Sequence, residues 1–142
     1  MAASPVKQLN AHISKMIATG LLDESFMALR KLQDAEDPDF VAGVVTNFLN
    51  DGDRMFGELT QLLERPFVDL HALYEKLHKF KGCSASVGAR QVTLACIQLE
   101  QFTGQQKTRE EWVSTLAKGR AAFDVVRSEF QTMIQVGDGR AS

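Results

Sequence analysis

The chain has 142 residues, 44% of them hydrophobic, and its formal net charge at pH 7 is −2. This length suits one domain with its own core and is too short for two ordinary domains. Because the net charge is slightly negative, the composition excludes the strongly basic field typical of proteins that bind nucleic acid or anionic membranes, and any basic patch must be local.

The sequence carries no evident membrane-spanning segment or signal peptide, and it has only two cysteines. No apolar stretch approaches the roughly 18 residues of a membrane-spanning helix, and the stretch from Met1 to Pro5 lacks a signal-peptide core. Cys83 and Cys96 lie inside predicted helices without metal-ligand spacing, so reduced thiols are the simplest interpretation. We therefore expect a protein of the cytoplasm, the nucleus or both, with no metal or cofactor of its own.

The N-terminal part of the chain predicts three helices. The first runs from about Val6 to Ala18, and Asp23 caps a second. Asp37-Pro38 begins the third, because proline is tolerated in a first helical turn, where its missing N–H has no helical partner. The apolar positions expected to face the core are Phe26, Leu29 and Leu32 in the second helix and Phe40, Val44, Phe48, Met55, Leu59 and Leu62 in the third.

Three further helices follow. Pro66 begins the fourth, the fifth ends at Gly104, and Thr108 with Glu111 forms a capping box for the sixth. Four long amphipathic helices joined by short loops predict an all-α fold, an antiparallel four-helix bundle with two additional N-terminal helices. We assign residues 1–136 to this single domain and expect residues 137–142, which have nothing to bury, to be disordered.

The fourth helix carries its chemistry on the face opposite its apolar stripe. The apolar stripe consists of Leu70, Leu73, Leu77, Phe80, Ser84 and Val87, and the second stripe of His71, Tyr74, His78, Lys81, Gly82 and Ala85. His78 therefore faces water, with Lys81 one turn later as a nearby cation. A glycine inside a helix costs about 1 kcal/mol relative to alanine, so Gly82 indicates that close approach by another molecule is favoured here.

Plainer interpretations exist for each of these residues. An exposed histidine is usually a solvated side chain, and a basic run such as Lys76, Lys79, Lys81 and Arg90 is usually a solvated face. His71 could share a metal ion with His78, but helical ligands normally stand four residues apart and no third ligand is apparent. The residue types alone therefore leave a functional site and an ordinary surface both open.

Residues 78–89, HKFKGCSASVGA, resemble the phosphoacceptor motif of plant-type histidine-containing phosphotransfer proteins, His-x-x-Lys-Gly-Ser-Ser-x-Ser-x-Gly-Ala. The similarity extends over nearly the whole chain, from Leu21 to Met133. It implies a histidine phosphotransfer domain with one phosphohistidine at His78, Lys81 steadying the phosphate, and Gly82 allowing a partner to dock closely. The sequence has no phosphate loop and no aspartate cluster for Mg²⁺, so we expect a phosphocarrier without ATP-dependent kinase activity.

The resemblance also implies the partners, which are receiver domains of hybrid histidine kinases and of response regulators, with Mg²⁺ held by the receiver. The chain would act as a monomer in a multistep phosphorelay, cytokinin signalling included, without binding nucleic acid or membrane. The expected docking surface consists of Lys79, Ala85 and Arg90, with Met27 and Arg30 from the second helix and Met55 or Phe56 from the third.

Four residues depart from the family pattern. Lys79 replaces the usual Gln, Phe80 replaces a common Leu, and Cys83 replaces the first Ser of the motif. Glu100 stands where plant members often carry an Arg near the phosphate. An acidic side chain that points inward at that position would repel the phosphohistidine. Glu100 therefore keeps a rival interpretation open, a receiver-binding scaffold or inhibitory adaptor with little phosphate transfer.

Overall fold

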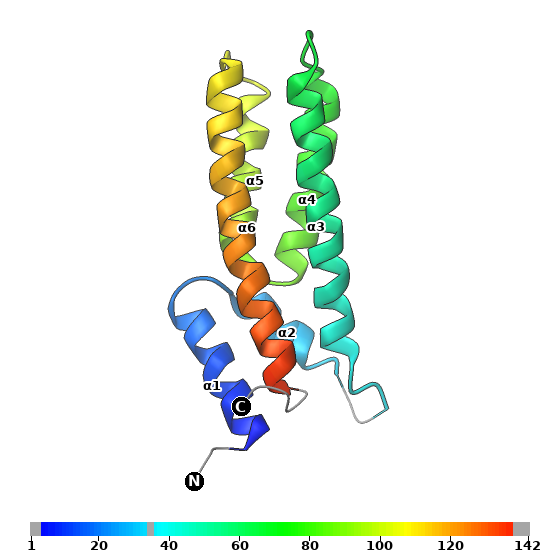
Figure 1. Cartoon of the computed structure of the whole chain (residues 1–142), viewed down its shortest axis with the longest axis vertical. Helices are drawn as coiled ribbons and strands as arrows, with labels where there is room; N and C mark the ends of the chain where they lie inside the picture. The colour runs from blue at the N-terminus through cyan, green and yellow to red at the C-terminus, as the bar shows by residue number, and fades with distance from the viewer. Residues whose placement is uncertain (1–3, 34–35, 138–142) are drawn as a thin grey trace.

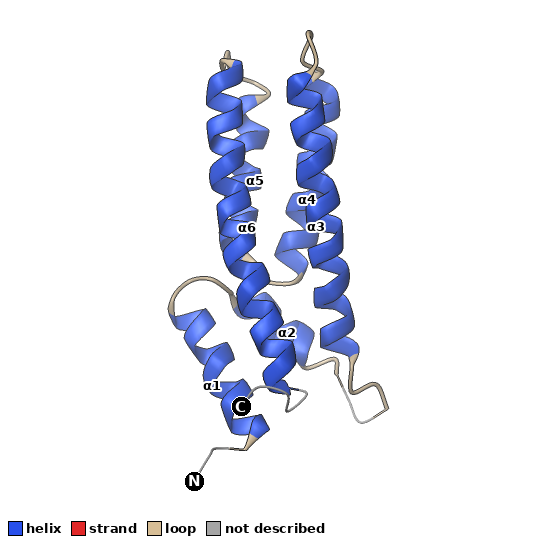
Figure 2. Cartoon of the chain, viewed as in Figure 1, coloured by secondary structure: helices blue, strands red, loops and turns tan. Residues whose placement is uncertain are grey.

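The computed structural model describes residues 4–33 and 36–137, which form six helices and no strand (Figures 1 and 2). The helices are α1 (Pro5–Ala18), α2 (Glu24–Arg30), α3 (Phe40–Glu64), α4 (Leu70–Ser86), α5 (Arg90–Phe102) and α6 (Arg109–Gly137). Helices α3 to α6 run alongside one another as a bundle, while α1 packs against α6 and α2 contacts α4 at one end (Figure 1). The predicted fold class is confirmed.

Phenylalanine rings from three helices fill the centre of the bundle. Phe80 of α4 lies 5.2 Å from Phe56 of α3 and 6.3 Å from Phe123 of α6, measured between ring centroids. Both pairs meet edge to face, a favoured geometry for aromatic rings. Because Phe80 and Leu77 are buried, the opposite face of α4 is turned outward. None of the helices in the described ranges is long and apolar enough to cross a membrane.

The Asp69 side chain marks the start of helix α4. Helix α4 begins at Leu70 and not at Pro66, because the Asp69 side chain accepts a hydrogen bond from the Ala72 amide at 3.0 Å. A carboxylate cap satisfies a helical N–H that has no partner within the helix, which proline cannot do. Helix α3 begins at Phe40, two residues after the predicted Pro38, and its N-cap residue Asp39 makes no side-chain capping hydrogen bond. The prediction that these two prolines open helices is wrong.

Other boundaries match the sequence more closely. The Asp23 cap is confirmed, and so is the capping box, in which the Glu111 amide donates to Thr108 Oγ1 at 3.1 Å and the Thr108 amide donates to Glu111 Oε1 at 3.3 Å. Leu32, predicted to face the core, lies beyond the end of α2 and is 67% exposed, so that prediction is wrong. Helix α6 extends to Gly137, and the rest of the tail predicted to be disordered lies outside the described residues.

The loop between α4 and α5 is tied to α2 through Gly88. This glycine has φ of 73°, in the left-handed region, and its carbonyl accepts a hydrogen bond from the Asp23 amide at 3.0 Å. A Cβ added at Gly88 would lie 2.6 Å from the Phe26 backbone nitrogen. Both the backbone conformation and the space around it therefore require glycine here.

We expect Gly88→Ala to lower the free energy of unfolding by about 2 kcal/mol or more, because alanine strains the left-handed backbone and collides with α2. Gly43→Ala is the matched control, since a Cβ at Gly43 of α3 meets nothing within 4 Å. That change should raise the free energy of unfolding by about 0.5–1 kcal/mol. Urea denaturation measures both, and equal stability of the two variants would contradict the role assigned to Gly88.

Candidate functional site

His78 stands on the outward face of α4, and its side chain is 60% exposed. The prediction that this histidine faces solvent is confirmed. Tyr74, one turn earlier, stacks on the imidazole with ring centroids 5.7 Å apart and planes inclined by 15°. One face of the ring is therefore covered by an aromatic neighbour, while much of the side chain remains accessible to a partner.

Glu100 of α5 contacts both His78 and Lys81. Its Oε1 atom lies 2.9 Å from His78 Nδ1, and its Oε2 atom lies 2.8 Å from Lys81 Nζ. Only 10% of the Glu100 side chain is exposed, compared with 30% of Lys81. The acidic side chain thus does point into the predicted site, where it contacts the Nδ1 edge of the ring.

The Glu100 carboxylate and the Lys81 ammonium each stabilise the charged form of the other. Burial by itself would raise the pKa of Glu100, but hydrogen bonds from Lys81 and His78 outweigh burial, and the pKa lies below its ordinary value. The same hydrogen bond from Lys81 to Glu100 raises the pKa of the lysine. At neutral pH the Glu100 carboxylate and the Lys81 ammonium are therefore both ionised.

A polar contact between α4 and α5 sets the register of the site. The buried Ser84 hydroxyl lies 2.8 Å from Thr93 Oγ1 and donates to the Lys81 carbonyl at 3.0 Å. Thr93 and Glu100 are seven residues apart, which places them two turns apart on the same face of α5. Fixing Thr93 against α4 therefore also brings Glu100 level with His78.

The surface beside His78 is open. Gly82 is exposed, and a Cβ built on it would meet nothing within 4 Å. Lys79 and Ala85 of α4 and Arg90 at the start of α5 are exposed as well. The structure thus brings the predicted contact residues of α4 and α5 to the surface, and their role in docking stays a prediction.

The second histidine of α4 belongs to a different contact. His71 Nε2 lies 2.9 Å from Glu75 Oε1, and both side chains are largely exposed. In the part of the chain that the structure describes, no group of three or more His, Cys, Asp or Glu side chains is arranged to hold a metal ion. His71 and His78 therefore have separate carboxylate partners on separate helices.

The expectation that Met55 or Phe56 reaches the surface is wrong. Their exposed fractions are 3% and 5%, because the side of α3 that carries them packs into the bundle, with the Phe56 ring 5.4 Å from that of Phe123. On α2, Met27 packs against the core, and Arg30 is partly buried and donates to Asn10 Oδ1 at 2.6 Å. The third helix therefore supplies neither of the predicted contacts.

Sequence reasoning missed the apolar contribution of α5. Leu94 and Ile97 are exposed on this helix, and Tyr74 is exposed on α4. Ile97 stands three residues before Glu100 and so lies on a neighbouring part of the same surface. The sequence does carry a signal for this exposure, because Leu94 and Ile97 fall outside the apolar stripe of Val92, Cys96 and Leu99.

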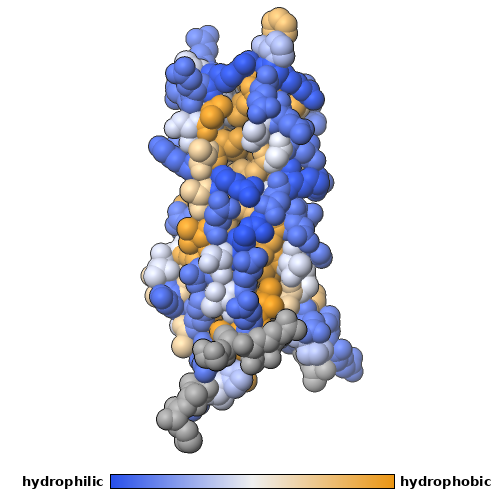
Figure 3. Space-filling view, in the orientation of Figure 1, coloured by the Kyte–Doolittle hydropathy of each residue, from blue (hydrophilic) through white to orange (hydrophobic). Residues whose placement is uncertain are grey.

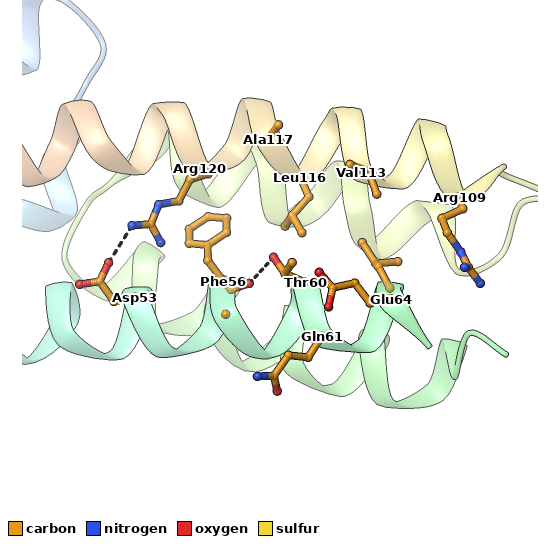
Figure 4. Close-up of a pocket in the computed structure, with 12 residues that line it drawn as sticks. Asp53, Phe56, Thr60, Gln61, Glu64, Arg109, Val113, Leu116, Ala117 and Arg120 are labelled. Carbon is orange, nitrogen blue, oxygen red and sulfur yellow. Dashed lines mark hydrogen bonds and ion pairs between the residues drawn. The ribbon is translucent and has the colours of Figure 1, made fainter. Parts of the chain in front are cut away.

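A cavity of about 930 Å³ lies elsewhere, between α3 and α6 (Figure 4). Phe56, Thr60, Val113 and Leu116 are among its lining residues, which all belong to these two helices. Figure 3 shows apolar surface between flanking polar side chains on this side of the molecule. No lining residue comes from α4 or α5, so the cavity is separate from the His78 site.

Comparison with known proteins agrees with this geometry. Residues 43–136 match the family model described as the Hpt domain. Histidine-containing phosphotransfer protein 1 of Oryza sativa subsp. japonica is 45% identical over 135 residues, which cover 95% of this chain and 91% of the relative.

Solved structures are similar over their full length. A histidine-containing phosphotransfer protein from rice superposes with a TM-score of 0.89 and 42% identity, covering 99% of this chain and 100% of that one. A histidine-containing phosphotransfer protein from maize superposes with a TM-score of 0.87 and 43% identity, covering 97% of this chain and 100% of that one. The chain therefore belongs to the Hpt-domain family of histidine-containing phosphotransfer proteins.

Proposed function

We propose that this chain is an intermediate of a multistep phosphorelay. His78 accepts a phosphoryl group from the receiver domain of a hybrid sensor histidine kinase and passes it to the receiver aspartate of a response regulator. The observation that carries the proposal is the exposed imidazole of His78 beside the open surface at Gly82. Membership of the Hpt-domain family supports the same role.

The site has what a phosphocarrier needs. Phosphoryl transfer depends mainly on positioning and on compensation of the charge on the transferring group. A neutral imidazole is nucleophilic at physiological pH, and the Lys81 ammonium lies one turn away. Mg²⁺ and the acidic pocket would belong to the receiver, so the chain would need no cofactor and no ATP-dependent kinase activity of its own.

The proposal extends to cellular context. As a monomer present in both cytoplasm and nucleus, the chain would link membrane-bound sensor kinases to nuclear response regulators, as in cytokinin signalling. Its slightly negative net charge supports partner-specific docking over general binding to nucleic acid. The direction of phosphate flow would follow the relative amounts of phosphorylated partners, because exchange between histidine and aspartate is reversible.

Receiver docking should leave a footprint on one side of the molecule. We expect amide chemical-shift changes, on addition of a receiver domain, to cluster on the exposed face of α4 around His78 and Ala85 and on α5 around Arg90 and Ile97. The exposed apolar side chains and the basic residues there suit an apolar patch with a charged rim. A footprint confined to α6 would contradict this docking surface.

The rival function is a scaffold that binds receivers without carrying phosphate. It is favoured by the Glu100 carboxylate, which lies next to the ring that would carry an anionic phosphoryl group. Incubation with a radiolabelled phosphorylated receiver domain separates the two functions. A phosphocarrier acquires acid-labile label from the receiver, whereas a scaffold forms a complex with the receiver and stays unlabelled.

A further inference from the structure

The contact between His78 and Glu100 fixes which ring nitrogen carries the proton. An ionised carboxylate has no hydrogen to donate, so Nδ1, at 2.9 Å from Glu100 Oε1, must be the donor. In the neutral imidazole the other nitrogen, Nε2, then holds the free lone pair. A solvated histidine favours the opposite tautomer, with its proton on Nε2, so this arrangement reverses the ordinary preference.

We propose that Glu100 is a positioning residue for the phosphoacceptor, which holds His78 in the Nδ1–H tautomer and presents the Nε2 lone pair to the incoming phosphoryl group. This inference rests on the proposed function and deepens it. An acidic residue at this position then favours phosphate transfer instead of opposing it. The Glu100 carboxylate contacts Nδ1, which carries the proton, and not Nε2, which would carry the phosphate.

Glu100 is itself held in place, as a positioning residue must be. Lys81 Nζ contacts its second carboxylate oxygen at 2.8 Å, and nine-tenths of its side chain is buried. Tyr74 stacks on the face of the imidazole while Glu100 holds its edge, so two contacts on different sides restrain the ring. The nucleophile is therefore oriented before any partner arrives, which reduces the entropic cost of reaching the reactive geometry.

The transfer step balances with this tautomer. The Nε2 lone pair forms an N–P bond while the P–O bond to the receiver aspartate breaks, and the aspartate carboxylate leaves with the electron pair. The proton stays on Nδ1, so the product ring is phosphorylated on Nε2 and carries a positive charge. The Glu100 carboxylate faces that charge across the hydrogen bond to Nδ1 and stabilises it.

The same proton assists onward transfer. When the next receiver aspartate attacks phosphorus, the N–P bond breaks and its electron pair returns to Nε2. Because Nδ1 has kept its proton, the ring leaves as neutral imidazole, a far better leaving group than the imidazolate anion. Glu100 should therefore accelerate phosphate gain and phosphate loss together, which suits a carrier that must not store the phosphoryl group.

The tautomer can be measured without any partner. Long-range ¹H–¹⁵N spectra, recorded at a pH where imidazole is neutral, distinguish protonated from unprotonated ring nitrogens. We expect His78 of the wild type to be protonated on Nδ1, and Glu100→Gln to shift it to a mixture of tautomers. The matched control is Glu75→Gln, which removes a histidine–carboxylate contact of equal length, 2.9 Å, from His71 on the same helix.

Rates give the second readout, with phosphoramidate as a small phosphodonor that needs no receiver. We expect Glu100→Gln to slow labelling of His78 about tenfold or more and to lengthen the lifetime of the phosphohistidine, with Glu75→Gln matching the wild type. A wild-type His78 protonated on Nε2, or equal labelling rates for wild type and Glu100→Gln, would overturn the inference. Labelling by phosphoramidate with the expected Glu100 effect, but none by receiver domains, would overturn the proposed function alone.

Discussion

His78→Gln is expected to abolish phosphorylation of the chain while leaving its fold intact. Glutamine has no ring nitrogen with a nucleophilic lone pair, so no N–P bond can form at this position. Because the His78 side chain is 60% exposed, its replacement should change the free energy of unfolding by no more than about 0.5 kcal/mol. Labelling by a phosphorylated receiver domain, with circular dichroism melting in parallel, measures both effects.

His71→Gln provides the control for this experiment. His71 lies two turns earlier on the same helix and has its own carboxylate partner, Glu75, at the same distance of 2.9 Å. It differs from His78 in lacking the cation and the glycine that follow His78. The His71→Gln variant should be labelled like the wild type. If His78→Gln is still labelled, or if His71→Gln is not, His78 is not the phosphoacceptor.

Gly82→Gln is expected to slow transfer from a receiver domain by about tenfold or more without loss of stability. Glutamine is a better helix former than glycine, and a Cβ at this position meets nothing within 4 Å, so the free energy of unfolding should rise by about 0.5–1 kcal/mol. The new side chain would occupy the surface, one turn after His78, where we propose that the receiver docks. Misplacement of reacting groups by about 1 Å can cost a hundredfold in rate.

Gly57→Gln separates the docking effect from the change in helix propensity. Gly57 lies in the middle of α3, is equally free of neighbours, and lines the cavity between α3 and α6. This variant should gain similar stability and transfer phosphate at the wild-type rate. If transfer by Gly82→Gln equals that of Gly57→Gln, the glycine beside His78 is not a docking requirement.

The accessible side of α4 could be predicted because its periodicity is strong. Leu73, Leu77 and Phe80 form a buried stripe, and that stripe alone turns His78 to solvent. Helix starts were harder to predict where two signals compete. Pro66 and Asp69 both favour a helix start, and the aspartate prevails because its side chain bonds to the Ala72 amide.

Contacts between helices could not be read from periodicity. His78 and Glu100 are 22 residues apart, and they meet because α4 and α5 pack against each other in a register that includes the Ser84–Thr93 contact. The burial of Phe56 could not be predicted for a related reason. Helix α3 packs against both α4 and α6, so its buried face is wider than the single stripe expected of a surface helix.

The most direct test of phosphoryl carriage is a time course with two receiver domains, the first of them phosphorylated and labelled. With the wild-type chain present, label should leave the first receiver, pass transiently through the chain, and accumulate on the second. Peptide mapping at alkaline pH should place the transient label on His78. Transfer between the receivers that is equally fast without the chain or with His78→Gln, or label that never reaches the second receiver, would contradict a carrier role.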